Sequence, residues 1–528
     1  MIDRRTLLAA AAASPLLYTR AFGETPKDTI VMAKRIDDII SLDPQEAFEY
    51  SGSEITGNIY DKLVTPDDAE PTKIVPTLAE SWTTSADGKS WTFRMRADRK
   101  VASGAVVTAD DAAFSLQRAV IMNKSPGFII AQLGFDKDNV TQRIRAIDPR
   151  TLQIDVPEQQ APTFLLYCLS AAVGGVVEKK VALEHEQNGD LGNGWLRANS
   201  AGSGPYMLRT ARASEGVALD ANPNYPQALP VKRIIIRHVA DPSIQLLLVQ
   251  RGDADVARDL LPEQLAIARA NPDMTVDSRP KASLMLISMN VAHPALAKPQ
   301  VRDAIRWAID YAAIEQNLVK DTFRVHQAFL PGGFPAALDD MPFRADPAKA
   351  KSLLAEAGFP NGLELTFDHA SSSPRAEIAQ ALQAQLALVG IRLTLMAGEG
   401  RQVLTRIRAR QHQLAIALWG ADYFDPNSNA QTFCENTDNS DASKNRTTAW
   451  QTSWRDEELT AESLAAVREL DPAKRVAMYQ TMQRQLQQRG PFAIMLQEVG
   501  SVVMRKPAAG LVQGPLSDRT VYRNITKT

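Results

Sequence analysis

The sequence predicts a mixed α/β protein built from two or more lobes. Runs with the apolar–polar alternation of strands recur between runs with helical periodicity over much of the chain, and this order is typical of α/β lobes. The chain has 528 residues, whereas a single hydrophobic core stops growing well before that length. No obvious linker separates independent domains, so we expect lobes that share strands, with the chain crossing between them.

Residues 1–23 are predicted to be an export signal. Arg4 and Arg5 precede an apolar stretch over residues 7–17, and Ala21 and Gly23 supply small residues at a spacing suited to signal-peptidase cleavage. The Arg pair favours the twin-arginine route, with the general secretory route as the alternative. The apolar stretch is shorter than the roughly 20 residues that a membrane-spanning helix needs. We therefore expect a mature protein that is soluble in a bacterial periplasm.

Strand and helix patterns open the mature chain. A tight turn at residues 85–89 joins two strand-like runs, and the second, "SWTFRMR", alternates apolar and polar residues as a half-buried strand does. Thr108 is predicted to cap a helix that starts at Ala109, where Asp110 and Asp111 suit the positive end of the helix dipole. "IRAIDPRTLQIDV" then predicts a strand, an Asp-Pro turn and a second strand.

Three later helices are predicted from a shared Asp-Pro start, in which Asp caps the helix and Pro takes the first helical position. They cover residues 241–252, 346–358 and 471–490, and each stops at a glycine, a common helix terminator. The turn "GSGPYML" enters a strand ahead of them, and "VKRIIIRHV" is a strong strand.

A further helical face and three strands complete the pattern. The strands are predicted at residues 363–370 and 391–397, around a helix that includes 378–388, and at the apolar run 414–419. The helical face follows the 3.6-residue period and contains Val301, Ile305, Ile309, Ala312 and Leu318.

Composition and motifs favour binding over catalysis. The formal net charge of −2 argues against a nucleic-acid binder, whose affinity comes largely from basic charge. The sequence has no G-x-S-x-G elbow, P-loop, H-E-x-x-H or C-x-x-C motif, and its six histidines are scattered. These motifs carry the commonest hydrolytic, nucleotide and metal chemistry. We therefore expect no enzyme, no catalytic residue, no metal ligand and no cofactor.

Several segments occur in one order and together resemble a known family. They are "LAESWTTSADGKSWTFRMRADRKVASGAVVTADDAAFSLQRA", "GSGPYML", "NPNYP", "VRDAIRWAIDYAAI" and "GADYFDP". The set is similar to family 5 extracellular solute-binding proteins, the periplasmic receptors that feed peptide, dipeptide and nickel ABC importers. The resemblance covers roughly residues 28–528. It departs at residues 100–104, where "KVASG" replaces an aromatic residue followed by His-Asp-Gly, a piece that is structural in the family.

The resemblance implies a domain plan. Two lobes close over a ligand, with a third subdomain and with hinge strands between the lobes, as in the periplasmic binding protein fold. The first lobe would comprise residues 24–280 and 491–528, with the extra subdomain inserted at about 61–186. The second lobe would comprise residues 281–490. The family also implies delivery to an ABC permease in the inner membrane, and we expect a monomer.

The two cysteines, Cys168 and Cys434, are predicted to be separate thiols. An oxidising compartment permits a disulfide, but nothing in the sequence brings these distant residues together. Dipeptide-binding members of the family often have a second Cys shortly after the position of Cys434. Here "DASKNRTTAWQTSW" has none, so we expect no local disulfide and a more mobile loop.

The loop after the strand at 414–419 is the predicted binding site. In peptide-binding members a "W-x-x-D-Y" loop supplies an Asp that holds the peptide α-ammonium, and the resemblance places Asp422 there. Burial of an ammonium is costly unless a carboxylate meets it. The predicted ligand contacts are Asp422, Gly420 and the aromatic residues Trp419, Tyr423 and Phe424. The alternative is that Asp422 caps a local turn and Trp419 is core.

Arg375 is the predicted cation for the ligand carboxylate. It lies just before a helix, about one position away from the place where dipeptide binders carry an Arg. A solvated Arg at the start of a helix is the alternative. Asp425, which follows Asp422 in the loop, is expected only to shape the turn.

The predicted function is capture of a short peptide or similar amine-bearing solute for ABC import. Within the same class the alternatives are receptors for a nickel chelate, an opine or a sugar. A secreted hydrolase is the alternative from another class, and it would need a nucleophile or a metal set that the sequence does not reveal. A sensor or chaperone that docks onto a membrane partner is a third possibility.

Overall fold

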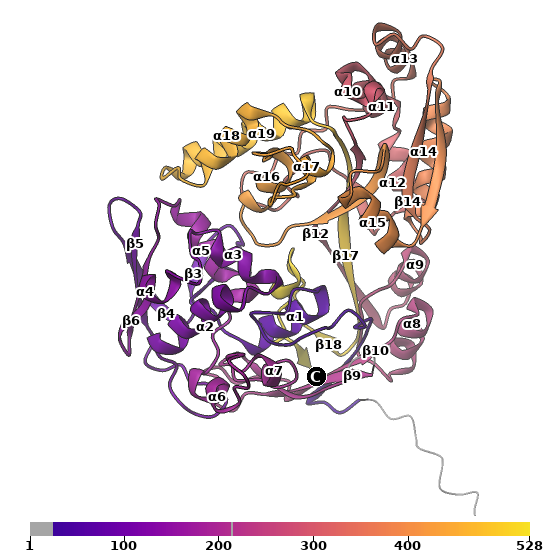
Figure 1. Cartoon of the computed structure of the whole chain (residues 1–528). Helices are drawn as coiled ribbons and strands as arrows, with labels where there is room; N and C mark the ends of the chain where they lie inside the picture. Colours follow the sequence, from indigo (N-terminus) through magenta and orange to yellow (C-terminus); the bar gives the residue numbers. More distant parts are fainter. Residues whose placement is uncertain (1–24, 213–214) are drawn as a thin grey trace, which may run out of the picture.

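The computed structural model describes residues 25–212 and 215–528. The export signal predicted over residues 1–23 lies outside the described residues. Two long antiparallel strands, β12 (Met274–Met289) and β17 (Phe492–Arg505), run through the middle of the molecule and connect its two halves (Figure 1). The predicted α/β fold with strands crossing between lobes is therefore confirmed.

These two strands belong to one extended mixed sheet. Its order is β15-β14-β16-β12-β17-β11-β1-β10-β9-β8, and β13 pairs with β17 beside this path. The other strands are β1 (Thr29–Lys34), β8 (Tyr206–Arg212), β9 (Gly216–Ala221), β10 (Arg233–His238), β11 (Val256–Ala257), β13 (Phe323–Val325), β14 (Leu363–Ala370), β15 (Ile391–Gly398) and β16 (Leu414–Gly420).

A register shift between Pro280 and Leu284 divides the sheet. Before the shift, residues 274–280 of β12 pair with residues 499–505 of β17, next to β11. After it, residues 284–288 pair with residues 492–497, next to β16 and β13. We call the half with β1 and β8–β11 lobe I, and the half with β13–β16 lobe II. The residues at the shift therefore lie where the lobes meet.

Helices cover the faces of both half-sheets and bury separate apolar cores. Lobe I carries α1 (Tyr50–Ile59), α8 (Pro242–Arg251) and α9 (Pro262–Ala270). Lobe II carries α11 (Pro299–Ala308), α12 (Tyr311–Leu318), α13 (Pro347–Glu356), α14 (Arg375–Ala387), α15 (Gly400–Arg408), α16 (Asn427–Cys434), α18 (Glu457–Ala466) and α19 (Pro472–Arg489).

A third unit, which we call the insert, has its own antiparallel sheet in the order β4-β5-β7-β6. The strands are β4 (Ala79–Thr84), β5 (Ser90–Met95), β6 (Ile144–Asp148) and β7 (Thr151–Asp155), and the main helices are α2 (Ala109–Met122), α3 (Phe128–Ala131) and α5 (Pro162–Ser170). Trp91 and Phe93 of β5 are buried in its core, as the alternation predicted. Tyr423 of lobe II also belongs to this core, so the insert packs against lobe II.

The predicted helix starts are confirmed. Thr108 and Asp111 form a reciprocal capping box at α2. Asp241, Asp346 and Asp471 each accept a hydrogen bond from a backbone N–H in the first turn of α8, α13 and α19. Each of these helices has Pro at its start, where the missing N–H costs nothing.

The single helical face predicted over residues 301–318 is wrong. The segment forms two helices, α11 and α12, because Ile309 is extended and the side chain of Asp310 accepts a hydrogen bond from the N–H of Ala313 at 2.9 Å. Asp310 thus caps a second helix in a new direction, and Ala312 is exposed rather than buried on the shared face.

Cys168 and Cys434 are free and buried, which confirms the prediction of two separate thiols. Burial raises the pKa of both well above the ordinary value of a thiol, so both are protonated at neutral pH. Within residues 25–212 and 215–528, we find no helix with the length and apolar composition needed to cross a membrane.

Candidate functional site

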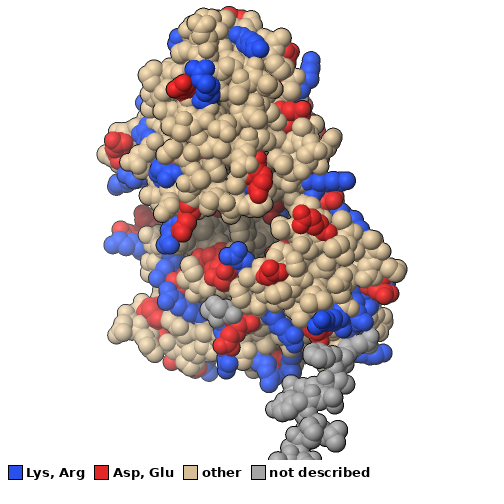
Figure 2. Space-filling model, turned by 90° about the vertical axis from the view of Figure 1, so that its right-hand side faces the viewer, with Lys and Arg blue, Asp and Glu red and all other residues tan. Residues whose placement is uncertain are grey.

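A cavity of about 660 Å³ lies where lobe I, lobe II and the insert meet. Figure 2 shows the hollow between the upper and lower parts of the molecule, with acidic and basic side chains at its lower edge. Lobe I contributes lining residues between 34 and 54 and at 258–259, and the insert contributes residues between 126 and 173. Residues 281–283 and 420–422 form the lobe II side, and the C-terminal segment contributes residues between 498 and 518.

The lobe II wall is built where β16 leaves the sheet. Gly420, the last residue of β16, pairs with Ser283 of β12, and Ala421 then donates its N–H to the carbonyl oxygen of Ala282 at 2.8 Å. The chain turns at Asp422, whose N–H donates to Oγ of Ser428 at 2.9 Å. Gly420 and Asp422, both predicted from the sequence, therefore lie at the cavity wall.

The side chain of Asp422 has no protein partner within the described residues: no hydrogen-bond donor or cation of the protein lies within bonding distance of its carboxylate. Burial raises the pKa of this carboxyl to about 7. The alternative that Asp422 caps a turn through its side chain does not agree with this geometry, since its backbone N–H makes the turn contact. Asp422 is half-buried, and a partly desolvated carboxylate without a partner is energetically costly, so this group is available to a ligand.

The three aromatic residues predicted as ligand contacts do not line the cavity. Trp419 is half-buried and donates its Nε1–H to Oδ1 of Asn429 at 3.1 Å. Tyr423 is buried in the insert core and donates its hydroxyl to Oε1 of Gln132 at 3.2 Å. Phe424 is buried in the core of lobe II. In this structure the aromatic side chains hold the loop between lobe II and the insert.

Asp425 does more than shape the turn. It is fully buried and forms a bidentate ion pair with Arg475 of α19, with N–O distances of 2.7 and 2.8 Å. Arg475 also donates to the hydroxyl of Tyr479 at 3.0 Å. The loop that carries Asp422 is therefore fixed to α19 by a desolvated charge pair.

Arg375 is not brought to the cavity. It is the first residue of α14, is half-buried, and donates from Nη2 to Oγ of Ser372 at 3.4 Å. Burial lowers the pKa of its guanidinium. Arg375 therefore lies outside the cavity that Asp422 lines. A cation that could take the role predicted for Arg375 comes from another element.

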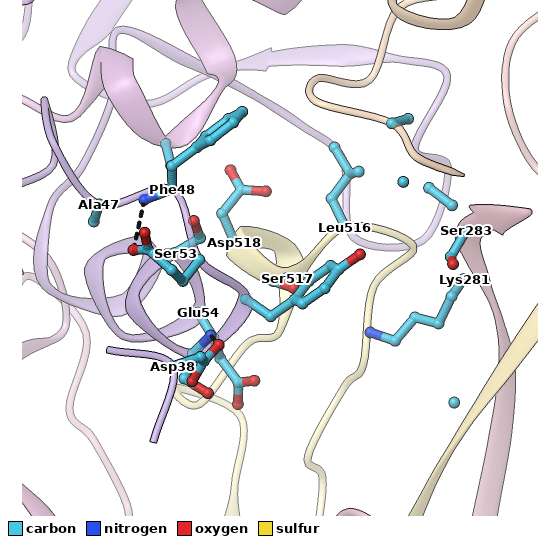
Figure 3. A pocket seen from close by; sticks show the side chains of 18 of the residues that line it. Asp38, Ala47, Phe48, Ser53, Glu54, Lys281, Ser283, Leu516, Ser517 and Asp518 are labelled. Atoms are coloured by element: carbon cyan, nitrogen blue, oxygen red, sulfur yellow. Dashed lines mark hydrogen bonds between the residues drawn. The ribbon is translucent and has the colours of Figure 1, made fainter. Parts of the chain in front are cut away.

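That cation is Lys281, at the register shift of β12. Its Nζ donates to the carbonyl oxygen of Gly514 at 3.0 Å, and it lines the cavity. Burial, followed by the positive charge of Arg258, lowers the pKa of Lys281 to about 7. Figure 3 shows the Lys281 side chain reaching from its strand toward the C-terminal segment that carries Leu516 and Ser517.

Lobe I supplies a buried charge cluster at the cavity floor. Glu54 of α1 pairs with Lys34 at 2.5 Å and with Arg258 at 2.6 Å, and it accepts the hydroxyl of Tyr522 at 2.6 Å. The two cations hold the pKa of Glu54 well below its ordinary value despite the opposing effect of burial. This cluster fixes α1 against β1.

Tyr50, the first residue of α1, connects lobe I to lobe II. A Cβ atom on Gly420 would lie 2.9 Å from the Tyr50 hydroxyl oxygen, so the absence of a side chain at Gly420 leaves room for the ring. Tyr50 is 66% exposed, yet the protein atoms around the cavity mouth partly desolvate its hydroxyl, and this effect and then the charges of Glu498, Asp422 and Asp38 raise the pKa of Tyr50 to about 12. Tyr50 therefore lies among acidic groups from different elements.

Sequence reasoning missed Tyr50, Lys281 and Glu498. The segment "EAFEYSGSE" at residues 46–54 could have indicated the first, because it places two aromatic residues among acidic ones. Lys281 and Glu498 lie on strands far apart in sequence and meet only through the pairing of β12 with β17. No local pattern distinguishes them.

No group of three or more His, Cys, Asp or Glu side chains in the described part of the chain is arranged to hold a metal ion. Among the residues that the structure describes, the cavity presents acids, one cation without an ion pair and apolar surface, which suit the binding of a small charged solute.

Two lobes joined by crossing strands around a cavity define a two-lobed periplasmic binding protein, and solved structures of this class superpose on the chain. HbpA2 from Haemophilus parasuis aligns with a TM-score of 0.79 at 22% identity, over 95% of this chain and 100% of that one. DppA from Helicobacter pylori, in complex with the peptide STSA, aligns with a TM-score of 0.77 at 23% identity, over 94% and 98%.

A sequence profile of the bacterial extracellular solute-binding proteins, family 5 (middle region), matches residues 73–441. The chain therefore belongs to this family, as the resemblance implied. It is 27% identical to the Escherichia coli K12 protein named "Probable D,D-dipeptide-binding periplasmic protein DdpA", over 99% of this chain and 98% of that one. It is 26% identical to di/tripeptide-binding protein 2 of Pseudomonas aeruginosa, over 85% and 86%.

Proposed function

We propose that this protein is the periplasmic receptor of an ABC importer and that it captures a short peptide or a similar amine-bearing solute. The observation that carries the proposal is the Asp422 carboxylate, which lines the cavity between the lobes without a protein partner. The names of the relatives given above support the ligand class, because a dipeptide or tripeptide brings an α-ammonium. Family members are named as binding proteins, which supports a role without catalysis.

Asp422 would receive the ligand ammonium. An ammonium that leaves water needs a carboxylate, and the pair is strongest where water is excluded. Gly420 beside it leaves room for the Tyr50 ring at the cavity wall. The other predicted ligand contacts lie outside the lining of the cavity in this structure, and they stay predictions: Trp419, Tyr423, Phe424 and Arg375.

The domain plan is part of the proposal. Residues 24–280 and 491–528 would form the first lobe with the insert at about 61–186, and residues 281–490 would form the second lobe. The register shift of β12 at residues 280–284 supports a hinge at the first crossing. The mature protein would act as a soluble monomer that hands its ligand to the permease.

The test begins with native mass spectrometry of gently purified protein, which weighs any ligand that co-purifies. Calorimetric titration with that ligand, or with dipeptides if none is found, then compares the parent with Asp422→Asn. Removal of one partner of a buried charge pair costs roughly 3–5 kcal/mol, so affinity should fall by on the order of a hundredfold or more. Affinity within about threefold of the parent would contradict the anchor role.

A matched control and a reciprocal change complete this experiment. Asp441→Asn removes a carboxylate from the surface of lobe II, where its side chain is 96% exposed, and should leave affinity unchanged. Acetylation of the peptide amine removes the same pair from the ligand side, so the loss on acetylation should be large in the parent and small in Asp422→Asn. Cleavage of the peptides during incubation would instead support the hydrolase alternative.

A further inference from the structure

We propose that the cavity selects ligands with net positive charge, and that the short peptide it takes carries a basic side chain in addition to its α-amine. This inference rests on the proposed function, because it treats the cavity between the lobes as the ligand site. It goes further by naming the substrate class from the charges that line the wall.

Acidic side chains outnumber basic ones at the wall of this cavity. Among the described residues, the lining includes eight Asp and Glu side chains but only four Lys and Arg side chains. Three of the eight have a cationic partner: Glu54 with Lys34 and Arg258, Asp37 with Arg35, and Asp518 with Lys62. A fourth, Asp259, accepts hydrogen bonds from the N–H of Arg35 and the amide of Gln245.

The remaining four acids, Asp38, Glu49, Asp422 and Glu498, form no ion pair with any residue that the structure describes. Asp38 accepts a hydrogen bond from the N–H of Ser51 through Oδ2, but its Oδ1 is buried without a partner. Figure 3 shows Asp38 beside Glu54 at the floor of the pocket. An unpartnered buried carboxylate oxygen is costly, and its place in the cavity indicates that a donor arrives with the ligand.

Three of these four acids converge although they come from different elements. Asp38 precedes α1, Asp422 follows β16, and Glu498 lies on β17. All three line the same cavity together with Tyr50, and their charges all raise the pKa of the Tyr50 hydroxyl. Their combined negative potential in a low-dielectric hollow attracts cations and repels anions.

One cation in the lining, Lys281, has no ion pair within the described residues. It can meet the ligand carboxylate, while Asp422 meets the ligand ammonium. A dipeptide with a neutral side chain would then leave Asp38, Glu49 and Glu498 enclosed and uncompensated, which costs binding free energy. A basic side chain supplies the missing charge, and an acidic one adds repulsion.

The test uses calorimetric titration of ligand-free protein with Ala-Lys, Ala-Gln and Ala-Glu, each in L,L and D,D forms. Ala-Lys should bind at least about tenfold more tightly than Ala-Gln, with Ala-Glu the weakest, and the preference should shrink at high salt. Equal affinity for the three peptides would overturn this inference and leave the proposed function standing. Failure of all three to bind would overturn both.

Substitutions of lining acids test which residues cause the preference for a basic side chain. Glu49→Gln and Glu498→Gln should each reduce the preference for Ala-Lys over Ala-Gln by about threefold or more, because each removes one of the negative charges that a neutral side chain leaves uncompensated. Asp277→Asn is the matched control, because it removes one negative charge from β12 at an exposed pair with Arg279 outside the cavity. A preference that survives both substitutions, or that Asp277→Asn reduces equally, would overturn the proposal. Thermal melts confirm that each variant is folded.

Discussion

The Asp422 carboxylate destabilises the free protein, whereas we expect it to stabilise the complex with an amine-bearing ligand. In the free protein, burial without a partner raises the pKa of its carboxyl to about 7, well above the roughly 3.9 of an Asp in an unfolded chain. The native state therefore holds a proton that the unfolded state releases. Stability falls as pH rises from about 4 to about 7, and the whole penalty is present above pH 7.

Asp422→Asn should therefore stabilise the free protein at pH 8. We expect a gain of about 1–3 kcal/mol in the free energy of unfolding, less than the full pKa difference because the group is partly solvated. The gain should vanish near pH 4, where the carboxyl is protonated in the folded protein. Urea unfolding at pH 4.5 and pH 8 measures it. A variant that is less stable than the parent at pH 8 would show that the carboxylate has a partner.

Ligand affinity should depend on pH through the same group. An ammonium bound to Asp422 favours the ionised carboxylate, so binding below pH 7 must first expel a proton. Through this group, affinity should rise with pH from 5 to about 7, by at most about tenfold per pH unit. Calorimetric titrations in buffers of different ionisation enthalpy should detect proton release. Asp422→Asn should lose the rise of affinity between pH 5 and about 7. If the variant keeps the same slope, the pH dependence arises from another titrating group.

At the residue scale, the sequence could predict a position in the fold only where the signal was local, and the ligand contacts themselves stay predictions. Asp422 and Gly420 follow an apolar strand within one short loop, so sequence alone places them where β16 ends. Arg375 failed to reach the cavity, and Lys281 was missed, because both positions depend on which distant strands pair. The aromatic residues of the loop were recognised as important, but packing against the insert rather than the cavity determines where they lie.

At the scale of elements, the loop after β16 depends on α19. Asp425 pairs with Arg475 in a fully desolvated setting, so Asp425→Asn would leave a buried guanidinium without its counter-charge. We expect a loss of roughly 3–5 kcal/mol in the free energy of unfolding. The double variant Asp425→Asn with Arg475→Gln should recover part of the loss, since neither charge then remains. Thermal and urea unfolding of the three variants measure this coupling, and additive losses would contradict it.

The prediction of helices was also correct where the signal was local. Capping residues at Thr108, Asp241, Asp346 and Asp471 act within one helical turn, and the structure has each helix where the cap predicted it. The segment at 301–318 was misread because its apolar spacing continues across Asp310. The cap at Asp310 overrides that periodicity, because it satisfies a backbone N–H at the start of α12.

At the scale of the whole molecule, the lobes are connected by few strands but share one cavity. The family and the crossing strands could be anticipated from ordered motifs, whereas the register shift at residues 280–284 could not, because strand register depends on pairing partners rather than on local sequence. That shift places Lys281 and Ser283 of β12 between the lobes. It also weakens the ladder at one point, which favours bending there.

Ligand binding should therefore close the two lobes about this point. Hinge closure is the usual response of periplasmic binding proteins, and a ligand that bridges Asp422 of lobe II and the acids of lobe I gains contacts on both sides only when the lobes approach. Small-angle scattering should show a smaller radius of gyration with ligand, and the melting temperature should rise because the ligand binds only the folded form.

Asp422→Asn at saturating ligand separates binding from closure, since it keeps the lobe I contacts and loses the lobe II anchor. It should bind weakly and shrink less than the parent. A ligand that raises the melting temperature but leaves the radius unchanged in the parent would mean that the cavity is already closed around its ligand site.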